Sequence, residues 1–149
     1  IVRRELPGLE FHLAGRNAPN TFEARISAPG VCFHGVIPDA AEFIHQHTIF
    51  IVPLFSGSGM RIKLLDYLSA GKATVTTTVG AEGIPITDGL EAFIADSPQS
   101  FANHIITLVR NPALRDSIGK NAIDFVKENF NNQQLTHQFI TFLQTIDRS

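Results

Sequence analysis

The most constraining feature of the chain is an apolar segment that leads into a glycine loop and then into a basic, amphipathic segment. Residues 48–52 consist of one threonine and four apolar residues in succession, a pattern typical of a strand buried on both faces. In the following loop, residues 53–60, Gly57 and Gly59 bracket a serine. Residues 61–70 then carry leucines at helical spacing. A strand, a glycine turn and a helix in direct succession predict a unit of an α/β fold.

This loop is suited to bind an anion. A tight glycine backbone can direct several N–H groups at one point, and a helix N-terminus adds about half a positive charge there. Arg61 and Lys63 add two full charges in the first helical turn, so a phosphate or diphosphate is the expected ligand. The loop is neither a Walker A motif nor a complete dinucleotide fingerprint, because Ile62 stands at the third glycine position. The alternative is a flexible turn with two solvated cations.

Strands and helices alternate along most of the chain. Strands are predicted at residues 9–14, 31–34, 48–52, 73–78 and 91–95, and helices at residues 20–27, 39–47, 61–70, 98–110, 112–130 and 133–146. Asn20 with Glu23, and Asp39 with Glu42, form capping-box patterns at two helix starts. The alternation predicts an α/β fold: a Rossmann-like parallel sheet with right-handed crossovers, flanking helices and a helical C-terminal tail.

Open parallel sheets bind ligands at the carboxyl ends of their strands. Three loops follow predicted strands at such ends: residues 15–17, 53–60 and 79–83. We expect these loops to lie along one edge and to form one site. For Arg16 in the first loop and Glu82 in the third, the alternatives are an ordinary surface arginine and an ordinary surface turn.

Composition narrows the function further. The chain has 149 residues, of which 44% are apolar, enough for one domain with a core. Its net charge of −2 gives no general attraction to nucleic acid or anionic membranes, and no apolar run approaches the ~20 residues of a membrane span. The histidines lack metal-ligand spacing, so no metal site is expected. The single cysteine, Cys32, fits a reducing compartment, and we expect a cytoplasmic protein or one peripheral at the inner face of the membrane.

Residues 31–96 resemble the C-terminal half of a GT-B glycosyltransferase of family four, the glycosyl transferases group 1. The resemblance is carried by Phe33-His34-Gly35-Val36, Ile51-Val52-Pro53, the run from Gly57 to Lys72, and the run from Val79 to Ile84. It implies that residues 1–149 are a single Rossmann-like donor-binding domain, a fragment truncated at its N-terminus. The first strand of that domain and an acceptor-binding N-terminal domain of the same protein would precede residue 1.

The resemblance also implies a reaction: retaining transfer of a sugar from a UDP-, GDP- or similar nucleotide sugar to an unknown acceptor, with no metal or other cofactor. Arg61 or Lys63 would stabilise the departing diphosphate, and Asp66 would hold the ribose. The donor site would comprise Gly57, Ser58, Gly59, Arg61, Lys63, Asp66, Gly80, Ala81, Glu82, Gly83 and Arg16. Two glutamates eight positions apart are common in the family, and here those positions hold Ser58 and Asp66.

Two alternatives to this interpretation remain at the level of the sequence. The chain could belong to a nucleotide-sugar epimerase of GT-B-like fold, or it could be a non-catalytic binding module in which residues 57–63 form an ordinary turn. The ion pair that helical spacing allows between Lys63 and Asp66 is the ordinary interpretation of those two residues. We expect the isolated fragment to be inactive. The apolar residues of the predicted helix 133–146 could also pair two copies of the fragment into a homodimer.

Overall fold

The fold is seen in a computed structural model that describes residues 1–130. The predicted helix at residues 133–146, and the homodimer that depends on it, lie outside the described residues.

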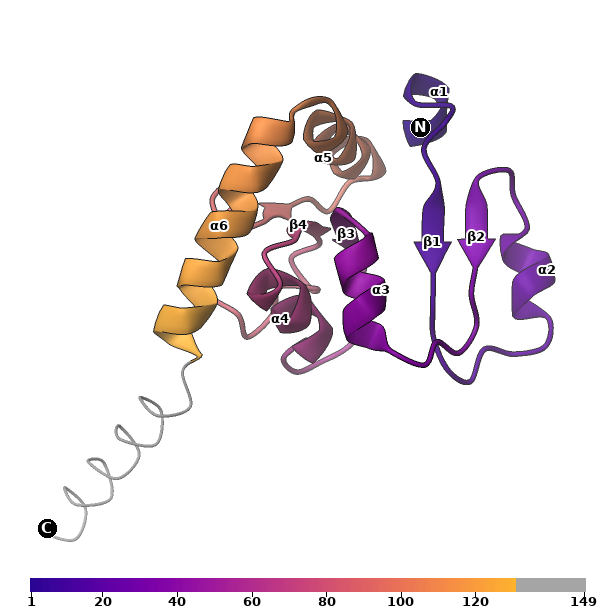
Figure 1. The fold of residues 1–149 in the computed structure, drawn as a ribbon, viewed down its shortest axis with the longest axis horizontal. Coiled ribbons are helices and arrows are strands. Elements are labelled where there is room, and N and C mark those ends of the chain that lie inside the picture. The colour runs from indigo at the N-terminus through magenta and orange to yellow at the C-terminus, as the bar shows by residue number, and fades with distance from the viewer. Residues whose placement is uncertain (131–149) are drawn as a thin grey trace, which may run out of the picture.

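Strands and helices alternate along the described chain, as the sequence predicts (Figure 1). The elements in chain order are α1 (Val2–Glu5), β1 (Phe11–Leu13), α2 (Phe22–Ile26), β2 (Val31–Phe33), α3 (Ala40–Gln46), β3 (Ile49–Val52), α4 (Ile62–Ser69), β4 (Ala73–Thr76), β5 (Phe93–Ile94), α5 (Pro98–Arg110) and α6 (Pro112–Asn129). The α/β class and the parallel strands are therefore confirmed.

The strands form two parallel sheets rather than one. One sheet has the order β1-β2, and the other has the order β3-β4-β5. Within the larger sheet Ile51 pairs with Val75, and Val75 pairs with Phe93. Within the smaller sheet His12 pairs with Cys32. No ladder joins the sheets in the described residues because β1 and β3 do not pair with each other.

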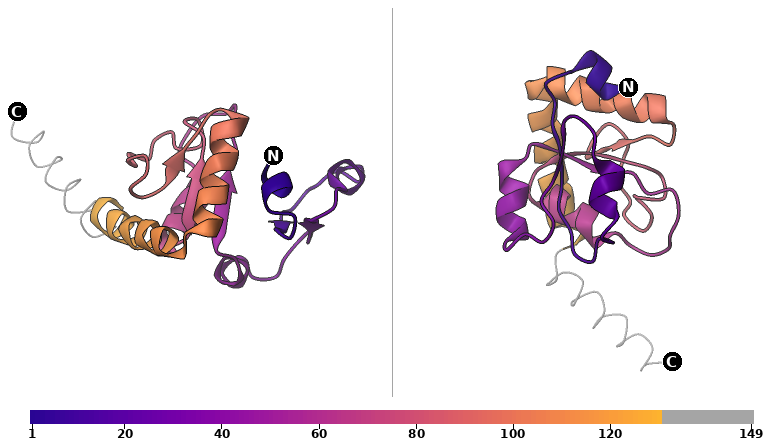
Figure 2. Two further views of the ribbon diagram at one scale, coloured as in Figure 1. Left: turned by 90° about the horizontal axis from the view of Figure 1, so that it is seen from above. Right: turned by 90° about the vertical axis from the view of Figure 1, so that its right-hand side faces the viewer.

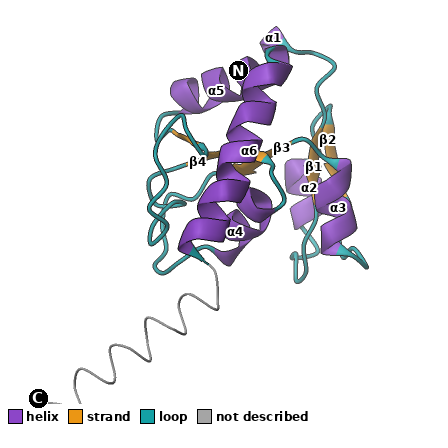
Figure 3. Ribbon diagram, turned by 60° about the vertical axis from the view of Figure 1, so that its left-hand side comes forward, coloured by secondary structure: helices purple, strands orange, loops and turns teal. Residues whose placement is uncertain are grey.

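Helices cover both faces of the larger sheet (Figure 3). On one face, Leu64 and Leu68 of α4 are fully buried with Val52 of β3 and with residues of α6. On the other face, Leu108 of α5 is buried against the β4 residue Val75. Successive residues of a strand point to opposite faces, so β3 contributes Val52 to the first cluster and Ile49 and Ile51 to the second, whereas β4 contributes Ala73 and Val75 to the second. The core of the molecule therefore lies around β4, whose four residues are all buried.

Three helices begin with a side-chain cap, among them the one predicted at Asp39. The Asp39 carboxylate accepts hydrogen bonds from the backbone N–H groups of Ala41 and Glu42, at 2.7 and 3.2 Å. Ser97 and Asn111 cap α5 and α6 in the same way. The capping box predicted at Asn20 is wrong: Thr21 is the N-cap, without a side-chain cap bond. There the backbone already turns at Thr21 (φ −84°, ψ −6°), and the Pro19 carbonyl accepts the Phe22 N–H instead.

Candidate functional site

In the glycine loop between β3 and α4, the backbone contacts the side chain of Arg61. Gly57 and Gly59 have φ angles of +130° and +84°, a region that favours glycine. The Arg61 side chain folds back over the loop, and its Nη1 donates to the Ser58 carbonyl at 3.0 Å. A Cβ atom added at Gly57 would lie 2.4 Å from Arg61 Nη2. Position 57 therefore needs glycine for its backbone conformation and to leave room for the guanidinium.

The Arg61 guanidinium is incompletely partnered. Its Nε and Nη2 atoms are buried and, among the described residues, neither has a hydrogen-bond partner. A buried cationic donor without an acceptor is costly, and the planar guanidinium matches two oxygen atoms of a carboxylate or phosphate. Arg61 is also the N-cap residue of α4, which has no side-chain cap, so the positive end of the helix dipole lies at the same place. The loop can therefore bind an oxyanion.

Lys63 and Asp66 form the ion pair that the helical spacing allows. Lys63 Nζ lies 3.8 Å from Asp66 Oδ2, and both side chains are substantially exposed. Exposed pairs of this kind contribute at most about 1 kcal/mol. Burial, together with the Asp66 charge, raises the pKa of the neighbouring Tyr67, whose ring stacks on Phe50 at 4.2 Å. In the described structure Lys63 is therefore engaged with Asp66, whereas Arg61 is not engaged with any carboxylate.

The loop after β4 meets the glycine loop. The position of a Cβ at Gly83 is 3.5 Å from Met60 Cβ. The Thr77 hydroxyl donates to the Leu54 carbonyl, and it accepts the Gly80 N–H at 3.0 Å. Thr77 thus fastens the two loops together. Sequence reasoning missed this residue, although a run of three threonines directly after a buried strand was the available signal.

The predicted site residues in the loop after β4, residues 79–83, have different surroundings. A Cβ at Gly80 would lie 2.2 Å from Thr76 Oγ1 and 2.8 Å from the Val52 carbonyl oxygen, so this glycine permits close approach to the ends of β3 and β4. Ala81 is part of the core, and Glu82 is exposed. Gly80 thus has a packing reason to be glycine, and its place in the donor site stays a prediction.

A carboxylate joins the ends of β4 and β5 beside these loops. Asp96 accepts hydrogen bonds from the Thr78 N–H at 2.8 Å and from the Thr78 hydroxyl at 2.7 Å. These bonds, led by the one from the hydroxyl, lower the pKa of Asp96. Asp96 thereby holds the start of the loop after β4 to the end of β5.

The first predicted loop, residues 15–17, is only partly tested by this arrangement. Arg16 is exposed and follows β1, and Gly15 in the same loop donates to the Gly35 carbonyl at 2.8 Å. Within residues 1–130, no hydrogen bond or ion pair connects Arg16 with the glycine loop. The structure brings two of the three predicted loops together, and the membership of Arg16 in the site stays a prediction.

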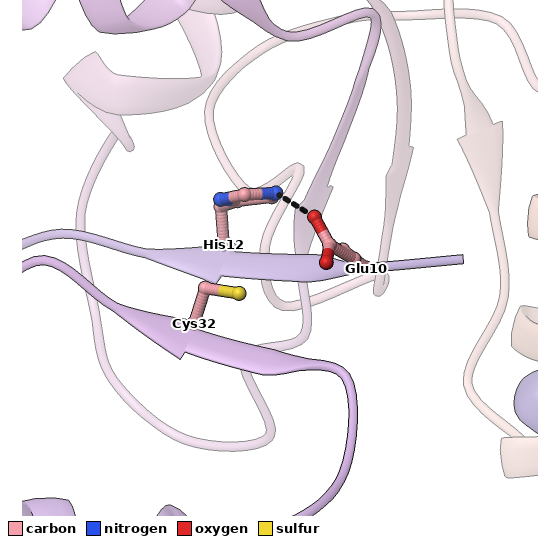
Figure 4. Close-up of side chains that lie close together, drawn as sticks. All are labelled: Glu10, His12 and Cys32. Carbon is pink, nitrogen blue, oxygen red and sulfur yellow. Dashed lines mark ion pairs between the residues drawn. The ribbon is translucent and has the colours of Figure 1, made fainter. Parts of the chain in front are cut away.

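One cluster of potential metal ligands escaped the sequence analysis. Glu10, His12 and Cys32 place ligand atoms within 4.8 Å of one another on one face of the smaller sheet (Figure 4). Spacing along the chain could not reveal this group, because Cys32 joins it by pairing across the two strands. His12 Nε2 lies 3.4 Å from a Glu10 oxygen, and His12 Nδ1 lies 2.9 Å from His34 Nε2. Both ring nitrogens of His12 therefore already have protein partners.

The fold of this domain is similar to that of the C-terminal half of GT-B glycosyltransferases. Sucrose-phosphate synthase from Thermosynechococcus elongatus superposes with a TM-score of 0.81 at 17% identity, over 99% of this chain and 41% of that one. The C-terminal domain of a glycosyl transferase group 1 family protein from Francisella tularensis superposes with a TM-score of 0.71 at 20% identity, over 88% of this chain and 74% of that one.

Sequence comparison gives the family. The model of the glycosyl transferases group 1 matches residues 1–111, and the chain belongs to this family. An uncharacterized 44.6 kDa protein in the cps region of Klebsiella pneumoniae is 33% identical over 144 residues, which are 91% of this chain and 37% of that protein. An uncharacterized glycosyltransferase of Methanocaldococcus jannaschii is 31% identical over 106 residues, 68% of this chain and 27% of that protein. The chain thus spans about a third of the length of these relatives. None of the described helices has the length and hydropathy needed to cross a membrane.

Proposed function

We propose that this chain is the donor-binding half of a retaining glycosyltransferase and that the glycine loop binds the diphosphate of a nucleotide sugar. The observation that carries the proposal is at Arg61, whose Nε and Nη2 are buried and lack partners among the described residues. A diphosphate would supply the missing acceptor oxygens and would neutralise the charge. The backbone of Gly57 and Ser58 lies beside the same guanidinium, and Gly59 follows in the same loop.

The chemistry follows from where charge develops. When the bond between the sugar and the diphosphate breaks, its electron pair remains on the diphosphate oxygen, and the anomeric carbon forms a bond to the acceptor oxygen. Arg61 and the start of α4 would stabilise the departing anion electrostatically, so this step needs no metal ion. If the ion pair between Lys63 and Asp66 breaks, Lys63 would supply a second cation for the diphosphate. The released Asp66 carboxylate would then accept hydrogen bonds from ribose hydroxyls.

Two structural relatives support the choice of donor. Anabaena HepE was crystallised in complex with UDP, and it superposes with a TM-score of 0.80 at 16% identity over 93% of this chain and 42% of that one. The pneumococcal O-GlcNAc transferase GtfA was crystallised with UDP and GlcNAc. We therefore propose a UDP-sugar as the first donor to test, ahead of a GDP-sugar. The acceptor-binding domain would lie in the remaining two thirds of the longer protein, so the isolated chain should not turn over.

Calorimetric titration of the full-length protein with UDP and with GDP tests this proposal. Arg61→Ala should weaken binding of the preferred nucleotide about 10- to 100-fold, because the charge-assisted hydrogen bonds of the guanidinium are lost. Arg61→Lys should recover only part of the affinity, because an ammonium cannot make the paired contact. Arg25→Ala, which removes an exposed arginine on α2, is the matched control and should leave affinity unchanged. Equal affinity of Arg61→Ala and the unaltered protein would refute the proposal.

A further inference from the structure

The smaller sheet carries, on one face, three side chains of the kinds that bind transition metals. The ligand atoms of Glu10, His12 and Cys32 lie within 4.8 Å of one another. The register pairs His12 with Cys32, and Glu10 lies two residues before His12, on the same face of the sheet. Figure 2 shows β1 and β2 standing apart from the larger sheet, whose strand β3 leads into the glycine loop. The cluster is therefore separate from the candidate donor site.

The distance between His12 and Glu10 suits two ligands of one ion better than it suits a hydrogen bond. His12 Nε2 lies 3.4 Å from a Glu10 carboxylate oxygen. Protein N–H···O bonds are about 2.7–3.2 Å long, whereas nitrogen and oxygen ligands that are each about 2.1 Å from a tetrahedral Zn²⁺ lie about 3.4 Å apart. Because Glu10 is exposed, rotation of its side chain can bring the carboxylate closer to the Cys32 sulfur.

A second histidine orients His12. His12 Nδ1 lies 2.9 Å from His34 Nε2, and the planes of the two rings differ by 20°. A hydrogen bond between two ring nitrogens needs one donor and one acceptor. When His12 Nδ1 donates, its Nε2 carries no hydrogen, and the lone pair of Nε2 is free for a metal ion. Histidine ligands ordinarily donate their other ring N–H to a neighbouring acceptor in this way.

The ring of His12 is also packed against α3. The His47 ring centre lies 4.6 Å from that of His12, and the His47 Nδ1 donates to the Phe43 carbonyl at 2.7 Å. The Phe43 ring in turn packs edge-on against His34 at 5.5 Å. These contacts limit the rotation of both histidine rings, so the His12 Nε2 atom is held toward Glu10.

We propose that Glu10, His12 and Cys32 bind one divalent transition-metal ion, with Zn²⁺ as the expected ion, and that His34 is a positioning residue for this site. A thiolate combined with an imidazole favours Zn²⁺ over Mg²⁺ and Ca²⁺, which prefer oxygen ligands. Cys32 releases its thiol proton to the solvent when the ion binds, and a water molecule fills the fourth position of the tetrahedron. The ion then links β1 to β2. The proposal does not depend on which ligand the glycine loop binds.

Calorimetric titration of the metal-free, full-length protein with Zn²⁺, in the absence of nucleotide, tests the proposal. His34→Ala removes the outer partner of His12 and should weaken Zn²⁺ binding about 10- to 100-fold, and Cys32→Ser and Glu10→Gln, which each remove a ligand, should weaken it at least as much. His34→Gln keeps an acceptor for the His12 N–H and should lose less. His45→Ala, at an exposed histidine of α3, is the matched control and should bind Zn²⁺ like the unaltered protein.

Absorption of the Co²⁺-loaded protein identifies the ligands. A thiolate bound to Co²⁺ gives a charge-transfer band in the near ultraviolet, which should be present in the unaltered protein and weaker or lost in Cys32→Ser. His34→Ala should show the full band once Co²⁺ is saturating, because all three ligands remain. Loss of the band at saturation would overturn the positioning role of His34.

Two results would overturn the metal site itself. Zn²⁺ affinity and stoichiometry that are the same in Glu10→Gln, Cys32→Ser and the unaltered protein would assign any bound zinc to another part of the longer protein. A thiolate band that is absent from the unaltered protein, or unchanged in Cys32→Ser, would exclude Cys32 as a ligand. Glu10→Gln alters only an exposed side chain, so its result decides the matter even where Cys32→Ser does not fold. Neither measurement uses a nucleotide, so the donor-site proposal is tested separately.

Discussion

The half of the molecule built on β3, β4 and β5 differs from the half built on β1 and β2 in how its apolar surface is covered. In the first, all four residues of β4 are buried, and helices pack on both faces. In the second, no described residue before Ile44 is buried. Both halves follow the same alternating sequence pattern. A strand pattern alone therefore does not make a core, which also needs neighbouring strands and covering helices.

The position of the glycine loop follows from this difference. An exposed arginine on a loosely packed strand could move to find water, and it would need no ligand. Arg61 instead stands at the junction of the buried strand β3 and helix α4, whose residues Leu64 and Leu68 are fully buried. The packed half holds the guanidinium in place, and we propose that a bound anion supplies its missing hydrogen bonds.

The largest expected effect separates the two halves by stability. In the 149-residue chain, Leu68→Ala should lower the free energy of unfolding by about 2–5 kcal/mol, because the site is fully buried and α6 limits its collapse. Leu13→Ala in β1, which is only partly buried, should cost about 1 kcal/mol or less. Urea unfolding measures both. Equal losses would show that the two halves share one core.

The next effect separates a structural glycine from a site glycine. Gly80→Ala should destabilise the chain by about 1–3 kcal/mol, because its Cβ would press on Thr76 and on the Val52 carbonyl. Gly57→Ala should weaken binding in addition to stability, because φ at this position is +130° and the added Cβ would also displace the Arg61 guanidinium. Thermal unfolding and UDP calorimetry on both variants give the comparison. A Gly57→Ala protein that binds as tightly as the unaltered one would contradict the role given to Arg61.

A smaller effect is expected at the second cation. Lys63→Ala should weaken UDP binding by about tenfold or less, because Lys63 is exposed and already paired with Asp66. Lys120→Ala on α6, also exposed, is the control and should have no effect. Calorimetry at two salt concentrations should show the Lys63 contribution decreasing with salt. A loss larger than that of Arg61→Ala would make Lys63 the main phosphate ligand.

The smallest effect concerns pH. The hydrogen bonds from Thr78 lower the pKa of Asp96 below its ordinary value of 3.8 in the folded state. A carboxyl with a lowered folded pKa contributes stability that is fully present above its unfolded pKa and is lost as the pH falls through the folded one. Asp96→Asn should therefore be less stable than the unaltered chain at neutral pH, and this difference should shrink in acid below about pH 4. A pH-independent difference in urea unfolding would contradict this.

Most elements could be predicted from the sequence because their signals are local. The caps at Asp39, Ser97 and Asn111 and the apolar run at residues 48–52 each specify a boundary without reference to distant residues. The Asn20 capping box failed because a backbone turn at Pro19 already supplied the first carbonyl.

What the sequence could not provide depends on contacts between distant segments. The division into two sheets depends on which strands pair with each other, and local patterns do not encode that pairing. The ligand-like group of Glu10, His12 and Cys32 exists only through cross-strand pairing. In the candidate site, the glycines and cations were predicted from the sequence. The unpartnered nitrogens of Arg61 and the link that Thr77 makes between the loops could not be, because both depend on how the folded segments lie in space.

The central claim is that the Arg61 guanidinium, held in the glycine loop, receives the diphosphate of the donor. A crystal structure of the full-length protein with UDP tests it most directly. We expect Nε and Nη2 of Arg61 to lie within about 3 Å of diphosphate oxygens, with the hydrogen bond from Arg61 to the Ser58 carbonyl retained. A diphosphate bound elsewhere, or an Arg61 whose free nitrogens are bonded to protein groups, would contradict it.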